Sequence, residues 1–179
     1  MSYVKSLIIR VAASALLLTL PFNVFYVLLA KITLWTSLIP IYLIRYPIEV
    51  DGNNLLIAGQ SLEFVSACVA TSAYYLLALL VLLTKDVKPK TGAYVFLTGA
   101  LLIFVMNVAR IGILLFILVR FGENWFDNAH IFFWQFVSTA YVALVWIFLT
   151  YKFKVKSIPV YSDALFLFSK SVFHKKRKR

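Results

Sequence analysis

The sequence predicts an all-α polytopic membrane protein with about four transmembrane helices, an interfacial helix and a small outer β-hairpin before the second span. Hydrophobic residues make up 63% of the 179 residues, against about 45–50% in a soluble domain, and mean hydropathy is +0.90. The apolar residues gather in long runs, and a helix crosses a bilayer with about 20 of them. Basic residues flank these runs, as orientation in a membrane requires.

The N-terminal part of the chain holds one long apolar run and one short one. The long run covers residues 7–30, with Pro21 as a candidate kink. Residues 32–44 continue apolar between two basic residues, but they are too few for an ordinary span. We interpret them as an interfacial or re-entrant helix that ends at Pro40. A full second span here would reverse the topology of everything downstream.

Residues 46–64 have a different character. Apolar and polar residues alternate over 48–50, Asp51-Gly52 follows, and an apolar stretch resumes at 55–58. An Asp-Gly pair between β-prone stretches is a strong hairpin signal. We expect a small hairpin that caps the outer membrane face directly before the next span.

Three further apolar runs are long enough to cross the membrane. They cover residues 66–84, 93–121 and 131–150. A basic loop at 85–90 joins the first two, and a polar loop at 122–129 joins the last two. The C-terminal tail is aromatic and basic, which suits an interfacial helix on an anionic leaflet.

Charge orients the chain if it spans the membrane four times. The basic residues of the N-terminus, the loop 85–90 and the tail then share one side, which is cytoplasmic by the positive-inside rule. The acidic residues of the other loops fall on the opposite side: Glu49, Asp51, Glu63, Glu123 and Asp127. We expect a multi-pass protein of the cell membrane with both termini in the cytoplasm. The net charge of +11 thus reflects orientation, and we expect no nucleic acid partner.

Three polar residues fall near the predicted outer face, namely Cys68, Arg110 and His130. A thiol, a guanidinium and an imidazole that converge there indicate a cysteine nucleophile with a base and an anion stabiliser. Cys68 alone is weak evidence, because a lone cysteine in an apolar helix is usually a packing residue. Its expected place in the first turn of a helix would favour the thiolate. As the only cysteine it excludes an internal disulfide and a CxxC metal site, and we expect no metal and no cofactor.

Arg110 is the strongest single signal. An arginine inside a span costs about 2.5–3.5 kcal/mol on insertion scales, so such residues tend to be functional; the alternative is snorkelling to the outer headgroups. His130 can accept and return a proton near neutral pH, and a helix start there would keep it neutral; its alternative is a half-exposed interfacial histidine. Asn107 lies on the same helix face as Arg110, where it orients the arginine or the substrate, or makes an ordinary interhelical hydrogen bond.

At these residues the chain resembles the exosortase/archaeosortase family of membrane cysteine transpeptidases. The resemblance covers about residues 46–150 and rests on Cys68 after an alanine and an outer hairpin, the Asn107-x-x-Arg110 pair in a later span, and His130 opening the next. It implies that Cys68 is the nucleophile, Arg110 the oxyanion or substrate stabiliser, and His130 the acid and base. It also implies the partners. These are exported proteins with a C-terminal signal of a short motif, one transmembrane helix and a basic tail, and a lipid or other amine that accepts the new C-terminus in some members.

The sequence departs from the family pattern in two ways. After Ala-Cys the family usually has Ser or Thr and then Gly, where this chain has Val69 and Ala70. Many members also have more spans than the four expected here. The first departure bears on the substrate motif more than on the nucleophile, and the second indicates a minimal core version.

The sequence therefore predicts a transmembrane catalytic domain over residues 1–156, including the hairpin at 46–64, and a cytoplasmic basic interfacial tail over residues 157–179. Two hypotheses from different classes remain. In the first, the protein is a sorting transpeptidase or protease with its active site facing the outside. In the second, it is a non-catalytic membrane subunit or small transporter component in which Arg110 binds an anionic ligand or lipid. Only the first requires a reactive Cys68 that is reachable from outside.

Overall fold

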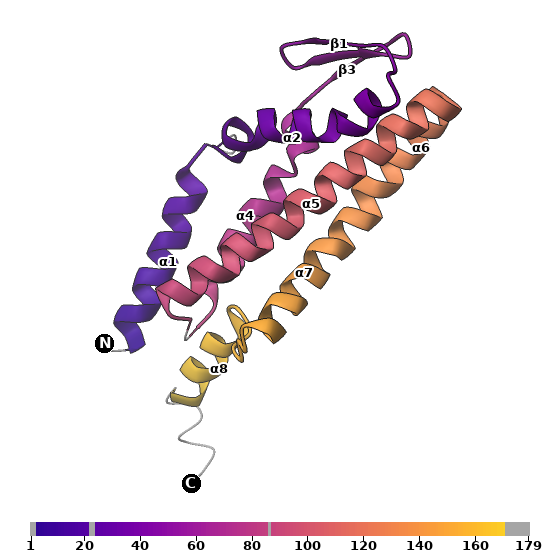
Figure 1. The fold of residues 1–179 in the computed structure, drawn as a ribbon. Coiled ribbons are helices and arrows are strands. Elements are labelled where there is room, and N and C mark those ends of the chain that lie inside the picture. The colour runs from indigo at the N-terminus through magenta and orange to yellow at the C-terminus, as the bar shows by residue number, and fades with distance from the viewer. Residues whose placement is uncertain (1–2, 22–23, 86, 171–179) are drawn as a thin grey trace.

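Helices make up most of the chain in the computed structural model, which describes residues 3–21, 24–85 and 87–170. The helices are α1 (Tyr3–Thr19), α2 (Val24–Leu43), α3 (Ser66–Val69), α4 (Thr71–Leu83), α5 (Pro89–Phe121), α6 (Glu123–Phe132), the π-helical turn η1 (Phe133–Val137), α7 (Ser138–Lys152) and α8 (Tyr161–Lys170). The strands are β1 (Ile48–Asp51), β2 (Asn54–Ile57) and β3 (Gln60–Glu63). The helices run as a bundle, and the small sheet covers one end of it (Figure 1).

Three helices of the described part of the chain are long and apolar enough to cross a membrane. They are α2, α5 and the continuous helix that α6, η1 and α7 form over Glu123–Lys152. The predicted helical membrane protein is confirmed, whereas the count of four spans is not. The run 66–84 yields only the 13 residues of α4, which reach about 20 Å at 1.5 Å per residue. The 33 residues of α5 reach about 50 Å, more than the roughly 30 Å hydrocarbon core.

The helix boundaries near the N-terminus differ from the sequence prediction. The run 7–30 is not one kinked helix, because α1 ends at Thr19 and α2 begins only at Val24. Pro21 lacks an N–H and restricts the residue before it, which ends a helix. The separate short helix predicted for 32–44 is also wrong, since α2 runs through Pro40 to Leu43. A proline in the last turn removes one hydrogen bond near an end that would fray anyway. Figure 1 shows α2 lying across α5 beneath the sheet.

The predicted hairpin is the first half of a three-stranded antiparallel sheet with the order β1-β2-β3. Asp51 pairs with Asn54, so Gly52, with a φ of +59°, begins a two-residue turn. The second turn contains Ala58 and Gly59, both with positive φ. The strand β3 was not predicted, because an alanine in the left-handed region gives no turn signal. The sheet leads straight into the segment that carries Cys68.

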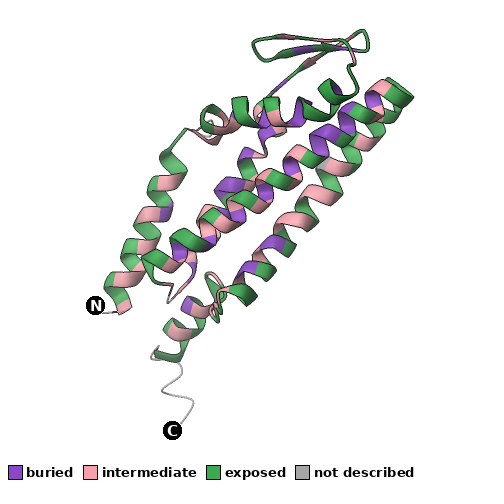
Figure 2. Cartoon of the chain, in the orientation of Figure 1, coloured by how far each residue is buried: buried purple, intermediate pink, exposed green. Residues whose placement is uncertain are grey.

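The centre of the bundle is α5, which packs against α2, α4, α6 and α7. At Gly99 the neighbouring helices come very close, since a Cβ there would lie 2.7 Å from side-chain carbons of both Leu77 and Leu149. Buried residues gather on the faces that the helices turn toward one another, and the outward faces are largely exposed (Figure 2). Many exposed side chains are large and apolar, such as Leu97, Leu101 and Phe116 on α5. These outward faces suit contact with lipid.

The end of the bundle opposite the sheet is held by a charged cluster around Asp163. This carboxylate of α8 accepts hydrogen bonds from Tyr3 Oη at 2.7 Å and from Arg10 Nη1 and Nη2 at 2.8 and 2.9 Å. Arg10 also donates to the carbonyl of Leu83 at the end of α4. The hydrogen bonds from Arg10 lower the pKa of Asp163 below its ordinary value. The predicted interfacial tail is thus helical over α8, and its basic end at 171–179 lies outside the described residues.

Candidate active site

Cys68 lies in a single isolated helical turn between the sheet and α4. The turn α3 has four residues, and the backbone N–H of Cys68 donates to the carbonyl of Val65 at 2.9 Å. Ala70 then takes the left-handed conformation, with φ +60° and ψ +39°, and α4 starts at Thr71. The sequence predicted that Cys68 lies in the first turn of a long helix, and this prediction is wrong. One turn has no substantial dipole, so a thiolate at Cys68 depends on its immediate neighbours, which are the backbone at Val65 and the side chain of Arg110.

Two buried side chains of α5 hold this turn from below. Asn107 Nδ2 donates to the carbonyl of Cys68 itself at 2.6 Å, and Arg110 Nη2 donates to the carbonyl of Ala67 at 3.2 Å. Asn107 is 4% exposed and Arg110 6% exposed. Residues three apart share a helix face, so the Asn-x-x-Arg spacing delivers both groups to one turn. The structure thus brings three of the four predicted site residues together.

Ser138 also contacts Arg110 and was missed by the sequence analysis. Arg110 Nη1 donates to Ser138 Oγ at 3.2 Å, and Ser138 Oγ donates to the carbonyl of Phe133, five residues back, at 2.9 Å. That carbonyl opens the π-helical turn η1. A π turn inserts one residue into the helix and is frequent at functional sites. The sequence gives no sign that this serine contacts Arg110, because the contact depends on the π-helical turn.

The charge of Arg110 has no carboxylate partner within the described ranges, where the one ion pair joins Arg10 to Asp163. Its Nε is buried without a hydrogen-bond partner. Arg110 lies close enough to Cys68 for the two groups to interact electrostatically. A buried cation with a spare donor beside a thiol can stabilise a thiolate or a developing oxyanion. Burial of Cys68 is the largest influence and disfavours the thiolate, and Glu63, at the end of β3, opposes it further.

His130 lies on α6, outside the hydrogen-bonded part of the site. Its exposed ring stacks on Phe126, with the ring centroids 5.7 Å apart and 27° between the planes. It is close enough to Arg110 and to Asp127 for electrostatic interaction, but none of the hydrogen bonds between described residues joins it to Cys68. The predicted helix start at His130 is wrong, because α6 begins at Glu123. His130 is therefore about two turns inside a continuous helix, beyond the reach of the helix dipole.

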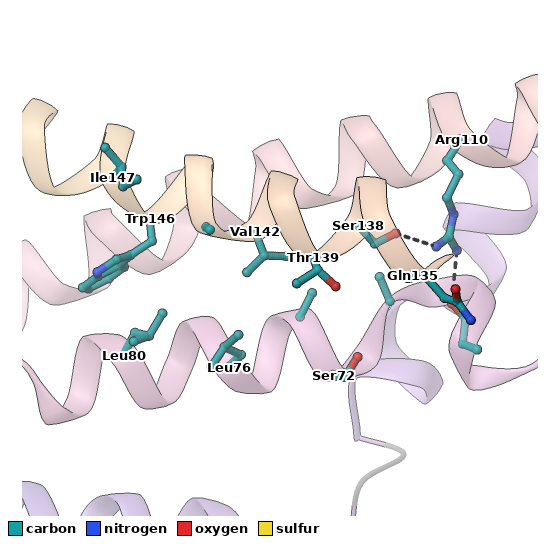
Figure 3. Close-up of a pocket in the computed structure, with 14 residues that line it drawn as sticks. Ser72, Leu76, Leu80, Arg110, Gln135, Ser138, Thr139, Val142, Trp146 and Ile147 are labelled. Atoms are coloured by element: carbon teal, nitrogen blue, oxygen red, sulfur yellow. Dashed lines mark hydrogen bonds between the residues drawn. The ribbon is translucent and has the colours of Figure 1, made fainter. Parts of the chain in front are cut away.

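An open groove of about 730 Å³ runs from Arg110 along the space between α4 and α7. Arg110 lies at one end with polar side chains around it, and Leu80, Trp146 and Ile147 lie at the other (Figure 3). The polar groups near Arg110 are Ser72, Gln135, Ser138 and Thr139. The groove therefore joins a charged, polar head to an apolar channel. Among the described residues, no cluster of His, Cys, Asp and Glu side chains could hold a metal ion.

The comparison with protein families identifies the family of the chain. The family model for transmembrane exosortases (Exosortase_EpsH) matches residues 2–151. This chain belongs to the transmembrane exosortase family. No curated protein and no solved structure matches it.

The backbone conformation at Ala70 bears on one departure from the exosortase pattern seen in the sequence. The position that is usually glycine in the family is Ala70 here, and its φ is +60°. Glycine adopts this left-handed region without steric cost, whereas alanine is strained there. The turn after Cys68 therefore keeps the conformation that a glycine would favour, although the side chain differs.

Proposed function

We propose that the protein is a membrane-embedded cysteine transpeptidase or protease that cleaves C-terminal sorting signals of exported proteins. The observation that carries the proposal is the buried, uncompensated Arg110, hydrogen-bonded to the turn that contains Cys68. A buried cation without a counter-charge is costly, so its retention beside a thiol favours a role in binding negative charge. Family membership supports the same conclusion.

The proposed reaction begins when Cys68 gives its proton to His130 and the thiolate attacks the scissile carbonyl carbon. The carbonyl oxygen becomes an oxyanion, which Arg110 stabilises through its N–H groups. The oxyanion collapses, the C–N bond breaks, and His130 returns the proton to the leaving amine. The thioester left on Cys68 is then attacked by water or by the amine of a lipid or other acceptor, which releases the thiol.

This mechanism requires His130 to approach Cys68, since no hydrogen bond joins them. Catalytic hydrogen bonds are often long in a free enzyme and tighten when substrate binds. The exposed position of His130 leaves its ring room to turn. Asp127, one turn away on α6, interacts electrostatically with His130 and is the competing candidate for the base.

We also propose the orientation. Both termini lie in the cytoplasm, and the sheet, α3 and the start of the groove face the outside. The reason is that the lysine-rich segments gather at the end of the bundle opposite the sheet. The partners are exported proteins with a motif, a transmembrane helix and a basic tail, and a membrane lipid is a candidate acceptor. The scissile bond would then reach Cys68 from the outer surface.

The nucleophile is tested by Cys68→Ala. It should abolish processing of a sorting-signal substrate while the protein remains folded and inserted, because removal of one sulfur leaves only a small void. Since Cys68 is the only cysteine, an impermeant maleimide applied to intact cells should label the wild type and not the variant. Continued processing by Cys68→Ala would end the nucleophile assignment. Absence of labelling in the wild type would contradict the proposed orientation.

The base is tested by His130→Ala and, as a matched variant on the same helix, Asp127→Asn. Loss of His130 should reduce the rate at least 10²-fold, since general acid–base catalysis contributes typically 10²–10⁴, and combining it with Cys68→Ala should add almost nothing. Asp127→Asn should keep most activity. The opposite result would move the base from His130 to Asp127.

The second candidate function is a non-catalytic subunit in which Arg110 binds an anionic ligand or lipid. The unpartnered Nε of Arg110 favours it as much as it favours catalysis. The two functions differ at Cys68, because a binding subunit loses nothing when the thiol is removed. A Cys68→Ala protein with full cellular function, combined with an inactive Arg110→Lys protein, would establish the binding role.

A further inference from the structure

A second cavity lies between α1, α4 and α5, separate from the groove at Arg110. Its volume is about 540 Å³. One end is formed by Arg10, Thr84, Lys88 and Pro89, where α5 begins, and the walls beyond are apolar and include Leu17, Phe25 and Phe96. Nothing in the proposed reaction uses this cavity.

The described residues at the charged end of the cavity carry an excess of positive charge. Asp163 neutralises Arg10, and these two residues form the one ion pair between described residues. Lys88 is exposed, lines the cavity and forms no ion pair with any residue that the structure describes. It is also the N-cap of α5, and its side chain makes no capping hydrogen bond. The start of a 33-residue helix adds partial positive charge and backbone N–H groups that favour an anion.

The length of the cavity matches one leaflet of a membrane. Along α5 it extends from Lys88 to Phe96, which is about 12 Å at 1.5 Å per residue. Half of a roughly 30 Å hydrocarbon core is about 15 Å. An acyl chain lying along Leu17 and Phe96 would thus keep its headgroup beside Lys88. A soluble anion would leave the apolar walls unused.

We propose that this cavity is a binding site for an anionic phospholipid of the leaflet on the lysine-rich side. The lipid phosphate lies between the Lys88 ammonium and the N-terminus of α5, and one acyl chain fills the space between α1 and α5. Phospholipid headgroups on that side of a cell membrane are frequently anionic, and each basic residue near them contributes about 1 kcal/mol of attraction. The charge at the mouth and the apolar walls together select an amphiphile with a negative head.

The cavity offers matched variants for each part of the site. Lys88 lines the cavity, whereas Lys90 is also exposed but does not. Likewise Ala13 of α1 lines it, whereas Ala12 is exposed outside it. Lys88→Gln and Lys90→Gln therefore remove the same charge, and Ala13→Leu and Ala12→Leu add the same volume. None of these residues belongs to the proposed catalytic site.

The test is native mass spectrometry of the full-length protein released from nanodiscs that contain equal amounts of phosphatidylglycerol and phosphatidylcholine with identical acyl chains. The wild type should retain one phosphatidylglycerol in preference to phosphatidylcholine. Lys88→Gln should reduce that preference about fivefold, the size expected for one basic residue near an anionic lipid, and Lys90→Gln should reduce it less than twofold. Ala13→Leu should lower retention of both lipids, and Ala12→Leu should not.

Several outcomes would overturn the proposal. Equal retention of the two lipids by the wild type would remove the anionic selectivity. Equal effects of Lys88→Gln and Lys90→Gln would indicate general surface charge. Full retention in Ala13→Leu, with thermal unfolding unchanged, would place the lipid elsewhere. A matched sample in detergent without lipid is incubated with inorganic phosphate, and retention of phosphate there would identify a soluble anion site.

Discussion

Two arginines lie among the helices, and the protein holds them in different ways. Arg10 forms two hydrogen bonds to the carboxylate of Asp163, with the two side chains 14% and 10% exposed. Arg110 is 6% exposed, and among the described residues it donates only to a backbone carbonyl and a serine hydroxyl. The first charge is compensated and ties α1 to α8. The second has no counter-charge among the described residues, and we propose that it binds negative charge on a substrate.

The comparison teaches that burial alone does not identify a functional charge. A buried ion pair is weak evidence even for stability, whereas a buried charge without a partner needs an explanation outside the protein's own contacts. The variants below test this distinction, beginning with the largest expected effect.

Arginine-to-lysine substitutions at the two positions should separate catalysis from structure. Arg110→Lys should lower the rate on a fixed sorting-signal substrate by about 10²–10³, the loss seen when one oxyanion donor is removed, because lysine lacks the planar fork. Arg10→Lys should leave the rate nearly normal and lower the unfolding temperature. Expression and membrane insertion are checked for each variant. Near-normal turnover in Arg110→Lys would show that Arg110 supplies only a generic positive charge or snorkels to the headgroups.

Asn107 tests whether the Arg110 region also positions the nucleophile. Asn107→Ala removes the hydrogen bond to the carbonyl of Cys68 and should lower kcat about 10- to 100-fold, since small misplacements of reacting groups cost rates of that size. KM should change little. Asn128→Ala is the control, because Asn128 is exposed and bonds only within α6. Equal kcat values for the two variants would contradict a positioning role.

Asp163→Asn should weaken the Arg10 region without affecting the chemistry. It leaves Arg10 without its counter-charge and should destabilise the protein by about 1–2 kcal/mol, below the 3–5 kcal/mol of a fully buried pair because both side chains retain some exposure. Thermal unfolding in detergent measures the loss. Below the unfolding temperature, the rate on substrate should remain within about twofold of the wild-type rate, because the regions around Arg10 and Arg110 act independently.

The same ion pair predicts a pH dependence. The pKa of Asp163 is lowered, chiefly by the hydrogen bonds from Arg10, so its stabilising contribution is fully present above the unfolded value of about 4. It is lost as the pH falls through the lowered folded value. The wild type should therefore lose stability relative to Asp163→Asn only in acid. An unchanged difference between the two proteins from pH 7 to pH 2 would show that Asp163 is not the titrating group.

The smallest effect is expected at the strained turn beside Cys68. Ala70→Gly should stabilise the protein by about 1 kcal/mol, because glycine accepts a positive φ that costs alanine roughly 1–2 kcal/mol. Ala73→Gly, inside α4, should instead destabilise it by about 0.5–1 kcal/mol. Thermal unfolding of both variants gives the comparison. Destabilisation by Ala70→Gly would mean that its methyl group contributes packing that exceeds the strain.

The sequence by itself determined the class of the protein and much of the chemistry. Hydrophobic content and long apolar runs predict membrane helices wherever they occur, since burial in lipid depends on local composition. Arg110 stood out because a charge within an apolar run is costly in any arrangement. The Asn107–Arg110 spacing predicted a shared face from helix geometry alone. The Asp-Gly turn predicted the start of the sheet for the same local reason.

Only the tertiary structure decided how these parts meet. The isolated turn α3 and the left-handed Ala70 follow from the packing of α3 and α4 against α5, and no local propensity favours an alanine there. Ser138 reaches Arg110 through a π turn, and Asp163 reaches Arg10 from 153 residues away along the chain. Such contacts depend on how distant segments pack. A sequence read alone therefore shows which groups are costly to bury, and the fold shows which of them are compensated.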